Sequence, residues 1–281
     1  MITVWQIERI LARPFEWVLS PFANAHPLLP LALISLIASI VLLLAFRWLS
    51  DQQALEDVKG KIHAHFLELK LFRHDVGVIW SAEKQILRFN LLYLAYLVKP
   101  LVVTLPIFVL FLVELDAWFT SRPLSVGEPV VVSVFVDASA GQVLESLRVA
   151  NGEGLRVETP ALRIPEERRA DWRIRALAAG EYQLEFVTGG QDSKPLTKLV
   201  RVGRERVAYV PRARSGAGWL SGFSNSEESP LPLGSRVSRI EVDYPGAVLT
   251  VFGWSVNWVV AFVVLSLVFA FLLKRPFGLV I

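Results

Sequence analysis

Histidines are the residues of this chain whose spacing first suggests chemistry, because His63, His65 and His74 lie close together. Two histidines can hold a metal from one helix face when they stand four positions apart, and no pair in this sequence has that spacing. The chain contains no cysteine, which excludes disulfides, thiolate zinc sites, iron–sulfur clusters and cysteine nucleophiles. We therefore expect these histidines to be solvated surface residues, and we expect neither a metal site nor a cofactor.

Sequence motifs of the common enzyme classes are also missing. There is no GxSxG nucleophile turn, no P-loop and no Rossmann glycine set. The pairs Asn151-Gly152 and Gly189-Gly190 fall between candidate strands, where hairpin turns explain them. The formal net charge of +3 is too small to indicate nucleic-acid binding. The sequence therefore favours a protein without catalytic activity and without a nucleic-acid partner.

Long uncharged runs raise the hydrophobic share of the chain to 53% and its mean hydropathy to +0.47. Residues 28–46 and 244–273 form runs of 19 and 30 residues without a charge, and residues 89–113 contain only Lys99 as a charged residue. A helix needs about 20 apolar residues to cross about 30 Å of hydrocarbon. We predict three transmembrane helices, over residues 28–48, 94–118 and 247–273.

Short basic segments next to these runs predict how the chain is oriented in a membrane. Residues 51–88 carry six lysines and arginines, and the tail 274–281 begins with Lys274 and Arg275. Because short cytoplasmic loops concentrate Lys and Arg, we expect a helical hairpin over residues 51–98 and this tail to be cytoplasmic. The N-terminus and the long segment between the second and third spans then lie outside. We expect an integral protein of the bacterial plasma (inner) membrane, with residues 1–27 as an amphipathic segment in the membrane interface.

The hairpin is predicted from an apolar stripe formed by Leu55, Val58, Ile62, Phe66 and Leu69, which follow one another at spacings of 3, 4, 4 and 3. The pattern breaks near Gly77, where we expect the first helix to end, and a second helical stretch leads into the middle span. Two helices packed back to back are the simplest arrangement. Their stripes could instead lie on the lipid surface or meet a partner.

Residues 122–243 are predicted to form an outer β domain. About seven short runs of β-branched and aromatic residues alternate with Gly, Pro and Asp, which is typical of a β-sandwich. Gly180, Tyr182 and Leu184 resemble the Gly-x-Tyr-x-Leu start of a late strand in immunoglobulin-like folds, where the tyrosine forms a corner and is structural. The expected fold is a multi-domain α + β membrane protein, with three transmembrane helices, a cytoplasmic helical hairpin and an extracytoplasmic immunoglobulin-like β-sandwich.

Two features of the outer domain are candidates for binding a partner. A local basic cluster is either a solvated strand face or a contact for an anionic lipid or a partner; its members are Arg168, Arg169, Arg173 and Arg175. A loop rich in Gly, Ser and Pro over residues 212–233 contains Trp219 and Phe223, which are expected at a tip facing the membrane or a partner.

The order of elements resembles the YidC/Oxa/Alb insertase superfamily, and in particular its minimal three-span branch, which includes the third subunit of the ER membrane protein complex and its prokaryotic relatives. The resemblance is carried by Phe46-Arg47 at the end of the first span, by the hairpin over residues 51–88, and by the sequence KPLVVTLPIFV over residues 99–109. It implies a membrane chaperone that carries out no chemical step. In that family a hydrophilic groove, open to cytoplasm and lipid, lowers the cost of moving a polar segment into the bilayer. The implied partners are the lipid bilayer and client membrane proteins.

Polar residues within or beside the spans are the candidates for such a groove, because polar groups in a bilayer are expensive and often functional. They are Ser35 and Ser39, which are one turn apart, and Arg47, Lys99, Thr104 and Ser266. The alternative for the hydroxyls is a bond back to their own helix, and Lys99 could simply extend to the interface.

Two other functions are compatible with the same sequence. The chain could be a non-catalytic accessory or structural subunit of a membrane complex, with the spans as its anchor and the β domain as its binding surface. It could also be an outward-facing sensor whose hairpin relays a signal.

Overall fold

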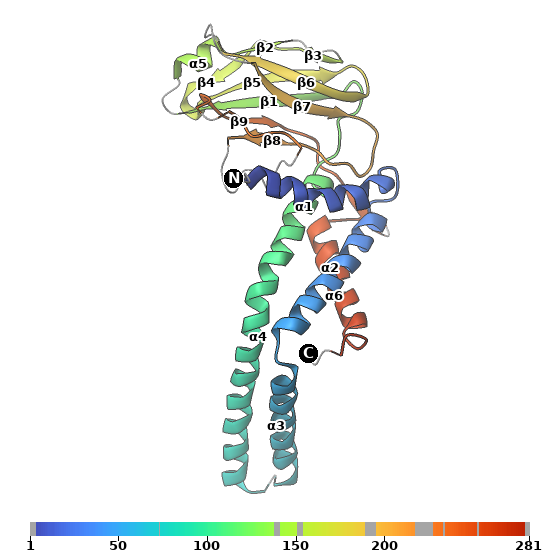
Figure 1. The fold of residues 1–281 in the computed structure, drawn as a ribbon, viewed down its shortest axis with the longest axis vertical. Helices are drawn as coiled ribbons and strands as arrows, with labels where there is room; N and C mark the ends of the chain where they lie inside the picture. Colours follow the sequence, from blue (N-terminus) through green and yellow to red (C-terminus); the bar gives the residue numbers. More distant parts are fainter. Residues whose placement is uncertain are drawn as a thin grey trace. The chain divides into compact units, whose positions relative to one another are not determined.

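The structure is a computed structural model, and it describes residues 4–72, 74–137, 141–150, 154–188, 195–216, 227–232, 234–251 and 253–278. The chain forms two compact units (Figure 1). The β unit comprises Met1–Pro30 and Leu112–Trp258, and the helical unit comprises Leu31–Phe111 and Val259–Ile281. The protein is therefore mixed α and β, as expected, and each unit is described separately below.

Four helices build most of the helical unit: α2 (Leu28–Leu49), α3 (Gln52–Leu71), α4 (Val76–Phe119) and α6 (Trp258–Leu273). By length and composition, α2 and α4 could each cross a membrane. Helix α6 contains no charged residue but has only 16 residues, so it rises about 24 Å.

The third apolar run does not form one helix over residues 247–273. Its first part pairs as an antiparallel hairpin of β10 (Leu249–Val251) and β11 (Trp254–Val256), and the helix begins only at Trp258. Gly253 has a φ of +86° at the turn, a conformation that glycine adopts without strain. Because β-branched residues flank this turn, strand pairing is preferred there over helix, although no charge interrupts the run.

Helix α4 contains two elements that were predicted as separate, the second hairpin helix and the middle span. The second hairpin helix and the middle span are one continuous helix of 44 residues, which runs through Pro100 and Pro106. Each proline lacks a main-chain donor, so one i→i−4 hydrogen bond of the helix is missing at each of the two positions. Gly77 does not end the first hairpin helix, because it lies in the first turn of α4, where Asp75 accepts hydrogen bonds from the main-chain nitrogens of Gly77 and Val78 at 2.9 and 3.2 Å.

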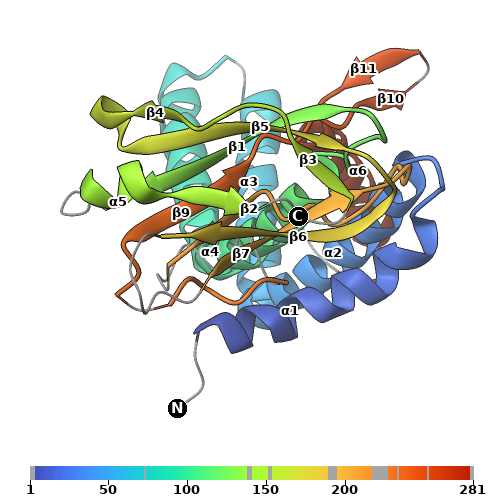
Figure 2. The same ribbon diagram turned by 90° about the horizontal axis from the view of Figure 1, so that it is seen from above.

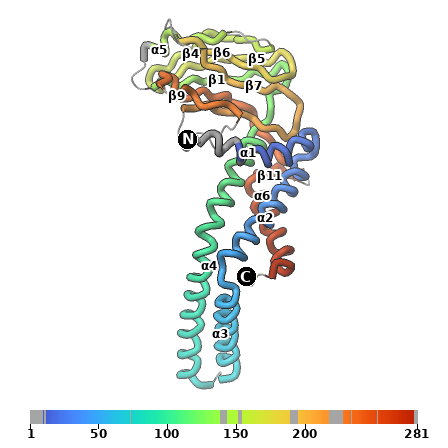
Figure 3. The backbone as a smooth tube through the Cα atoms, viewed as in Figure 1, coloured from blue at the N-terminus to red at the C-terminus, as the bar shows by residue number. Residues whose placement is uncertain are grey.

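Helix α3 lies antiparallel to the first half of α4 (Figures 1 and 3). The side chains of Leu55 and Val58 are buried, and the ring of His65 stacks on Phe89 with centroids 5.6 Å apart. Farther along the predicted apolar stripe, Phe66 is 54% exposed. The two helices therefore pack back to back, but the stripe is buried over only part of its length.

Besides the β10–β11 hairpin, the described residues of the β unit form two antiparallel sheets. The larger sheet has the strand order β3-β5-β1-β9-β8, with β4 also paired to β5, and the smaller has the order β2-β6-β7. A short helix, α5 (Gly141–Ser146), precedes β2. The strands are β1 (Pro129–Val136), β2 (Arg148–Ala150), β3 (Leu155–Val157), β4 (Leu162–Ile164), β5 (Arg169–Ala176), β6 (Gly180–Val187), β7 (Leu196–Val202), β8 (Ala213–Ser215) and β9 (Val237–Val242).

A single hydrophobic core joins the two sheets. Alternate residues of β1 point into it, from Val130 to Val136, as side chains on successive positions of a strand face opposite sides. Trp172 of β5 meets Phe186 of β6 edge to face, with ring centroids 5.7 Å apart. Tyr182 donates its hydroxyl to the carbonyl of Ala179 at 3.1 Å, which gives the tyrosine the structural role expected of it. Residues 207–210, one of the short β-branched and aromatic runs counted in the sequence, form no strand. Val210 donates its main-chain N–H to the carbonyl of Ala117 at 2.9 Å.

The N-terminal helix belongs to the β unit. It comprises α1 (Val4–Leu19) followed by a 3-10 turn, η1 (Ser20–Phe22). Phe15 and Leu19 are buried, whereas Trp17 is 83% exposed. The main-chain nitrogens of Arg206 and Val207 both donate to the carbonyl of Ala23, at 2.8 and 3.1 Å. These bonds hold the end of the amphipathic segment against the β unit.

Candidate functional site

An open cavity of about 290 Å³ lies between three helices of the helical unit. Each helix contributes one face, because the residues it places in the lining are spaced three or four apart. The lining consists of Ser39, Leu42, Leu43 and Phe46 from α2, Leu101, Thr104, Leu105 and Phe108 from α4, and Val263, Ser266, Leu267 and Ala270 from α6.

The cavity brings together three of the six residues predicted to form a groove. Ser39, Thr104 and Ser266 come from three different helices and are all buried. The Ser39 hydroxyl lies 2.9 Å from the carbonyl oxygen of Ser266, so it provides a polar contact between α2 and α6. Ser35 lies one turn before Ser39, outside the lining.

Most of these hydroxyls are hydrogen-bonded to main-chain carbonyls. Ser35 donates to Leu31 at 2.7 Å, Ser39 lies 2.7 Å from the carbonyl of Ser35, and Thr104 donates to Pro100 at 2.9 Å. These three side chains therefore bond back to their own helices, which was the alternative to a role in a groove. The other side chains of the lining are apolar, so the cavity offers mainly a hydrophobic surface.

Ser266 is the exception among the hydroxyls. Its Oγ is buried and has no hydrogen-bond partner within the part of the chain that the structure describes. Leaving a buried hydroxyl unpaired costs about 1–3 kcal/mol. A polar group that entered the cavity could relieve this cost by bonding to Ser266.

The two predicted groove cations lie outside the cavity. Arg47 is exposed in the last turn of α2, and Lys99 is exposed on α4. Neither belongs to the lining, although Arg47 directly follows the lining residue Phe46. The cavity therefore contains no charged side chain.

Phe108 and Ala270 line the cavity and were not among the predicted residues. Phe108 also stacks on Phe262 with ring centroids 5.6 Å apart. Each lies four positions after a predicted hydroxyl residue, Phe108 after Thr104 and Ala270 after Ser266. Extending each hydroxyl by one helical turn would have identified them.

The basic cluster of the β unit is largely neutralised by neighbouring acids. Arg169 lies 3.2 Å from Glu167, and Arg173 lies 3.2 Å from Glu158, which also pairs with Arg175. The hydrogen bond from Arg175 lowers the pKa of Glu158, so this carboxylate stays charged. Only Arg168 lacks an ion pair among the residues described, and it stands at a positive φ of 52°. Trp219 and Phe223 lie outside the described residues.

Of the three hairpin histidines, His63 and His74 are exposed, and His65 is half-buried against Phe89. His65 Nδ1 lies 2.8 Å from Glu68 Oε2, one turn along the same helix. Within the described ranges, no group of three or more His, Asp or Glu side chains is placed to hold a metal ion.

Comparison of the chain with protein-family models, with curated proteins and with solved structures gave no match in any of the three. The function proposed below is therefore argued from the residues and geometry of this chain.

Proposed function

We propose that this protein is an insertase-type membrane chaperone whose helices α2, α4 and α6 cross the bacterial plasma membrane. The observation that carries the proposal is the open cavity between these helices, where hydroxyl residues from all three meet. Its apolar lining suits the hydrophobic side chains of a client segment. Ser266 adds one unpaired hydroxyl for a polar group of that segment.

The short third helix supports this role. A rise of about 24 Å is less than the roughly 30 Å of hydrocarbon in a typical bilayer. A helix that is too short thins the bilayer locally, at a modest cost in free energy. A thinner bilayer shortens the path over which a client's polar residues are out of water, and this lowers the barrier to insertion.

The proposed topology follows from the charges of the hairpin and tail. Lys and Arg in these short segments place both in the cytoplasm, and the β unit then lies outside. The hairpin is positioned to meet a client before it reaches the membrane. No covalent bond needs to form or break, because insertion depends only on the solvation of the moving segment.

The alternative of an accessory subunit has a weaker physical basis. It relies on the arginines of the β unit as a binding surface, and three of the four are already paired with Glu or Asp. Binding a partner there would have to compete with these ion pairs, which lowers the electrostatic gain.

Depletion with a proteome-wide measurement of membrane-protein insertion tests the proposal. Cells depleted of the protein are complemented with Ala270→Phe, which places a ring in the cavity, or with Leu272→Phe, which adds the same ring at a side chain that is 67% exposed. We expect depletion to impair the insertion of a set of membrane proteins, Leu272→Phe to restore it, and Ala270→Phe to fail.

Two results would contradict the proposal. Normal insertion after depletion, with loss of one co-purifying complex, would favour the accessory subunit. Full restoration by Ala270→Phe, with both variants present in the membrane at equal amounts, would show that the cavity takes no part.

A further inference from the structure

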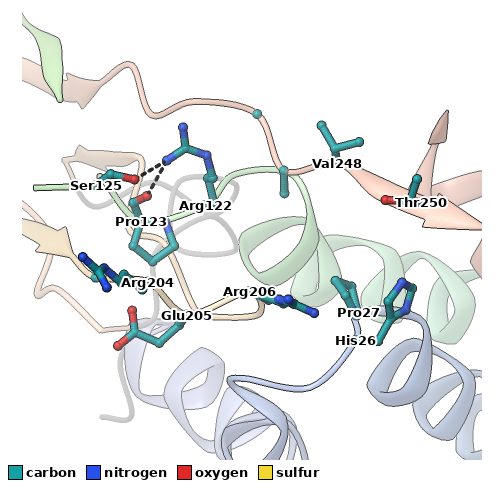
Figure 4. A pocket seen from close by; sticks show the side chains of 13 residues that line it. His26, Pro27, Arg122, Pro123, Ser125, Arg204, Glu205, Arg206, Val248 and Thr250 are labelled. Atoms are coloured by element: carbon teal, nitrogen blue, oxygen red, sulfur yellow. Dashed lines mark hydrogen bonds between the residues drawn. The ribbon is translucent and has the colours of Figure 1, made fainter. Parts of the chain in front are cut away.

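A second cavity, of about 690 Å³, lies within the β unit (Figure 4). Its lining combines cationic side chains with a small apolar wall. The residues that matter here are His26, Arg122, Arg204, Glu205, Arg206 and Val248. They come from four segments that are far apart in the sequence. None of these residues belongs to a recognisable sequence motif.

Main-chain hydrogen bonds hold these segments in place. Arg122 N donates to Pro245 at 3.0 Å, Gly203 N donates to Leu124 at 2.9 Å, and Arg206 N donates to Ala23 at 2.8 Å. The cavity is therefore framed by backbone that is already paired, so binding a ligand there requires little ordering of the chain.

The arginines of the cavity differ in whether they already form an ion pair. Arg122 is committed to Glu128, with two guanidinium–carboxylate bonds at 2.8 and 2.9 Å. Arg204 and Arg206 are exposed, and neither forms an ion pair with any residue that the structure describes. With three arginines and one acid, Glu205, the lining carries a formal charge of +2.

His26 adds a neutral hydrogen-bond donor. Its Nδ1 accepts the main-chain N–H of Leu28 at 3.3 Å, so its proton is placed on Nε2. Figure 4 shows Arg206 extending toward Pro27 and His26, whereas Arg122 is turned toward Ser125 and Pro123. Planar guanidinium groups and an imidazole N–H are the donors that proteins commonly use for phosphate oxygens.

The cavity also lies next to the ends of the apolar helices along the chain. His26 stands two residues before α2, and Arg122 stands three residues after α4. The side chain of Trp258, at the start of α6, donates to Thr120 at 2.8 Å. The apolar wall continues from Val248, 68% exposed, into the β10–β11 hairpin, which carries Trp254 at 78% exposure and extends beyond the sheets in Figure 2. Tryptophan side chains are enriched at membrane–water interfaces.

We infer that this cavity binds a phosphate group, carried either by an anionic phospholipid headgroup at the outer surface or by a soluble phosphate. Arg206, which extends toward Pro27 and His26 in Figure 4, binds the phosphate oxygens, and His26 Nε2–H donates to the same group. Arg204, which points away from these residues in Figure 4, adds positive charge to the cavity. Val248 and Trp254 contact the glycerol and the first part of the acyl chains when the phosphate belongs to a lipid. The lipid source rests on the membrane location proposed above, and reconstitution into nanodiscs tests that location separately.

The experiment uses the full-length protein in nanodiscs of phosphatidylcholine with or without phosphatidylglycerol, and, in detergent, inorganic phosphate as a soluble probe. Bound lipid is counted by native mass spectrometry, and phosphate binding is followed by the thermal midpoint. The test variant is Arg204→Gln/Arg206→Gln. The matched control, Arg148→Gln/Arg236→Gln, removes the same charge from exposed positions outside the cavity.

We expect the protein to retain phosphatidylglycerol over phosphatidylcholine, and the test variant to bind it at least about tenfold more weakly, because the charge-assisted contact of Arg206 and the positive charge of Arg204 are both lost. The control should bind like the original protein. Stabilisation by inorganic phosphate that the test variant loses would also support the site and assign the soluble source. Equal retention of both lipids without any phosphate effect, or equal behaviour of the two double variants, would overturn the inference.

Discussion

At the scale of single residues, the β unit contains a buried ion pair between Lys198 and Glu228. The Lys198 side chain is fully buried, contacts the Glu228 carboxylate, and donates to the carbonyl of Pro211 at 2.6 Å. Glu228 also accepts the main-chain N–H of Leu199 at 2.6 Å. Burial lowers the pKa of Lys198, and the carboxylate of Glu228 opposes that shift. The pair ties β7 to two segments that form no regular strand.

Removing one partner of this pair should be far worse than removing both. Lys198→Met leaves the Glu228 carboxylate buried without its cation, so we expect the free energy of unfolding to fall by about 3–5 kcal/mol. Denaturant unfolding of the full chain in detergent measures this. In the double variant Lys198→Met/Glu228→Gln the loss should be clearly smaller than the sum of the two single losses. Additive losses would show that the two side chains do not interact.

The Arg122–Glu128 pair predicts how acid affects the β unit. The hydrogen bond from Arg122 lowers the pKa of Glu128, so the unfolded chain takes up this proton at a higher pH than the folded chain. The stabilisation is complete above the ordinary carboxyl range and is lost as pH falls through the folded pKa. Below about pH 5, the original protein should therefore lose more stability than Glu128→Gln, measured as the unfolding midpoint against pH. Glu185→Gln, an exposed control, should follow the original curve, and coincidence of all three curves would refute the assignment.

At the scale of elements, the apolar stripe of α3 shows what spacing can and cannot predict. Spacings of three and four predict the helix that Gln52–Leu71 forms. They do not reveal that Leu55 is fully buried while Phe66 is 54% exposed, because burial depends on where the other helix of the hairpin lies. Side chains that share a stripe can therefore make very different contributions to stability.

This difference is measurable with two alanine substitutions. Leu55→Ala removes buried methyl groups and should destabilise the hairpin by about 2–5 kcal/mol. Phe66→Ala, on the same stripe, should cost less than about 0.5 kcal/mol. Hydrogen exchange of the hairpin amides in the full chain reports both effects. Equal acceleration of exchange in the two variants would mean that the stripe is buried along its whole length.

Some helices and strands can be predicted from the sequence, whereas other features depend on how the elements pack. The uncharged run of residues 28–46 predicts α2, and the high valine content of residues 129–136 predicts β1. The predicted start of the third apolar helix at residue 247 was wrong. Lack of charge does not distinguish a helix from the hairpin formed around Gly253. Ser39 and Ser266 were recognisable one by one, but the bond from the Ser39 hydroxyl to the Ser266 carbonyl depends on how α2 packs against α6.

At the scale of the whole molecule, the lack of cysteine makes the proposed topology directly testable. A single cysteine at Glu185, exposed in the β unit, should react with a membrane-impermeant maleimide in intact cells. A cysteine at Glu56, exposed on the hairpin, should react only after the cells are permeabilised. These outcomes are expected from the Lys and Arg of the hairpin and tail, because short cytoplasmic loops concentrate both residue types. The reverse labelling pattern would invert the topology.

The central claim is that the cavity between α2, α4 and α6 receives a client segment, and site-specific photocrosslinking tests it most directly. A photoactivatable amino acid at Ala270 lies in the lining, and one at Val264, 52% exposed and outside the lining, is the control on the same helix. During insertion of a stalled nascent membrane protein, the account predicts a protein crosslink from position 270 and only lipid crosslinks from position 264. A nascent-chain crosslink that is absent from position 270, or equal at both positions, would contradict it.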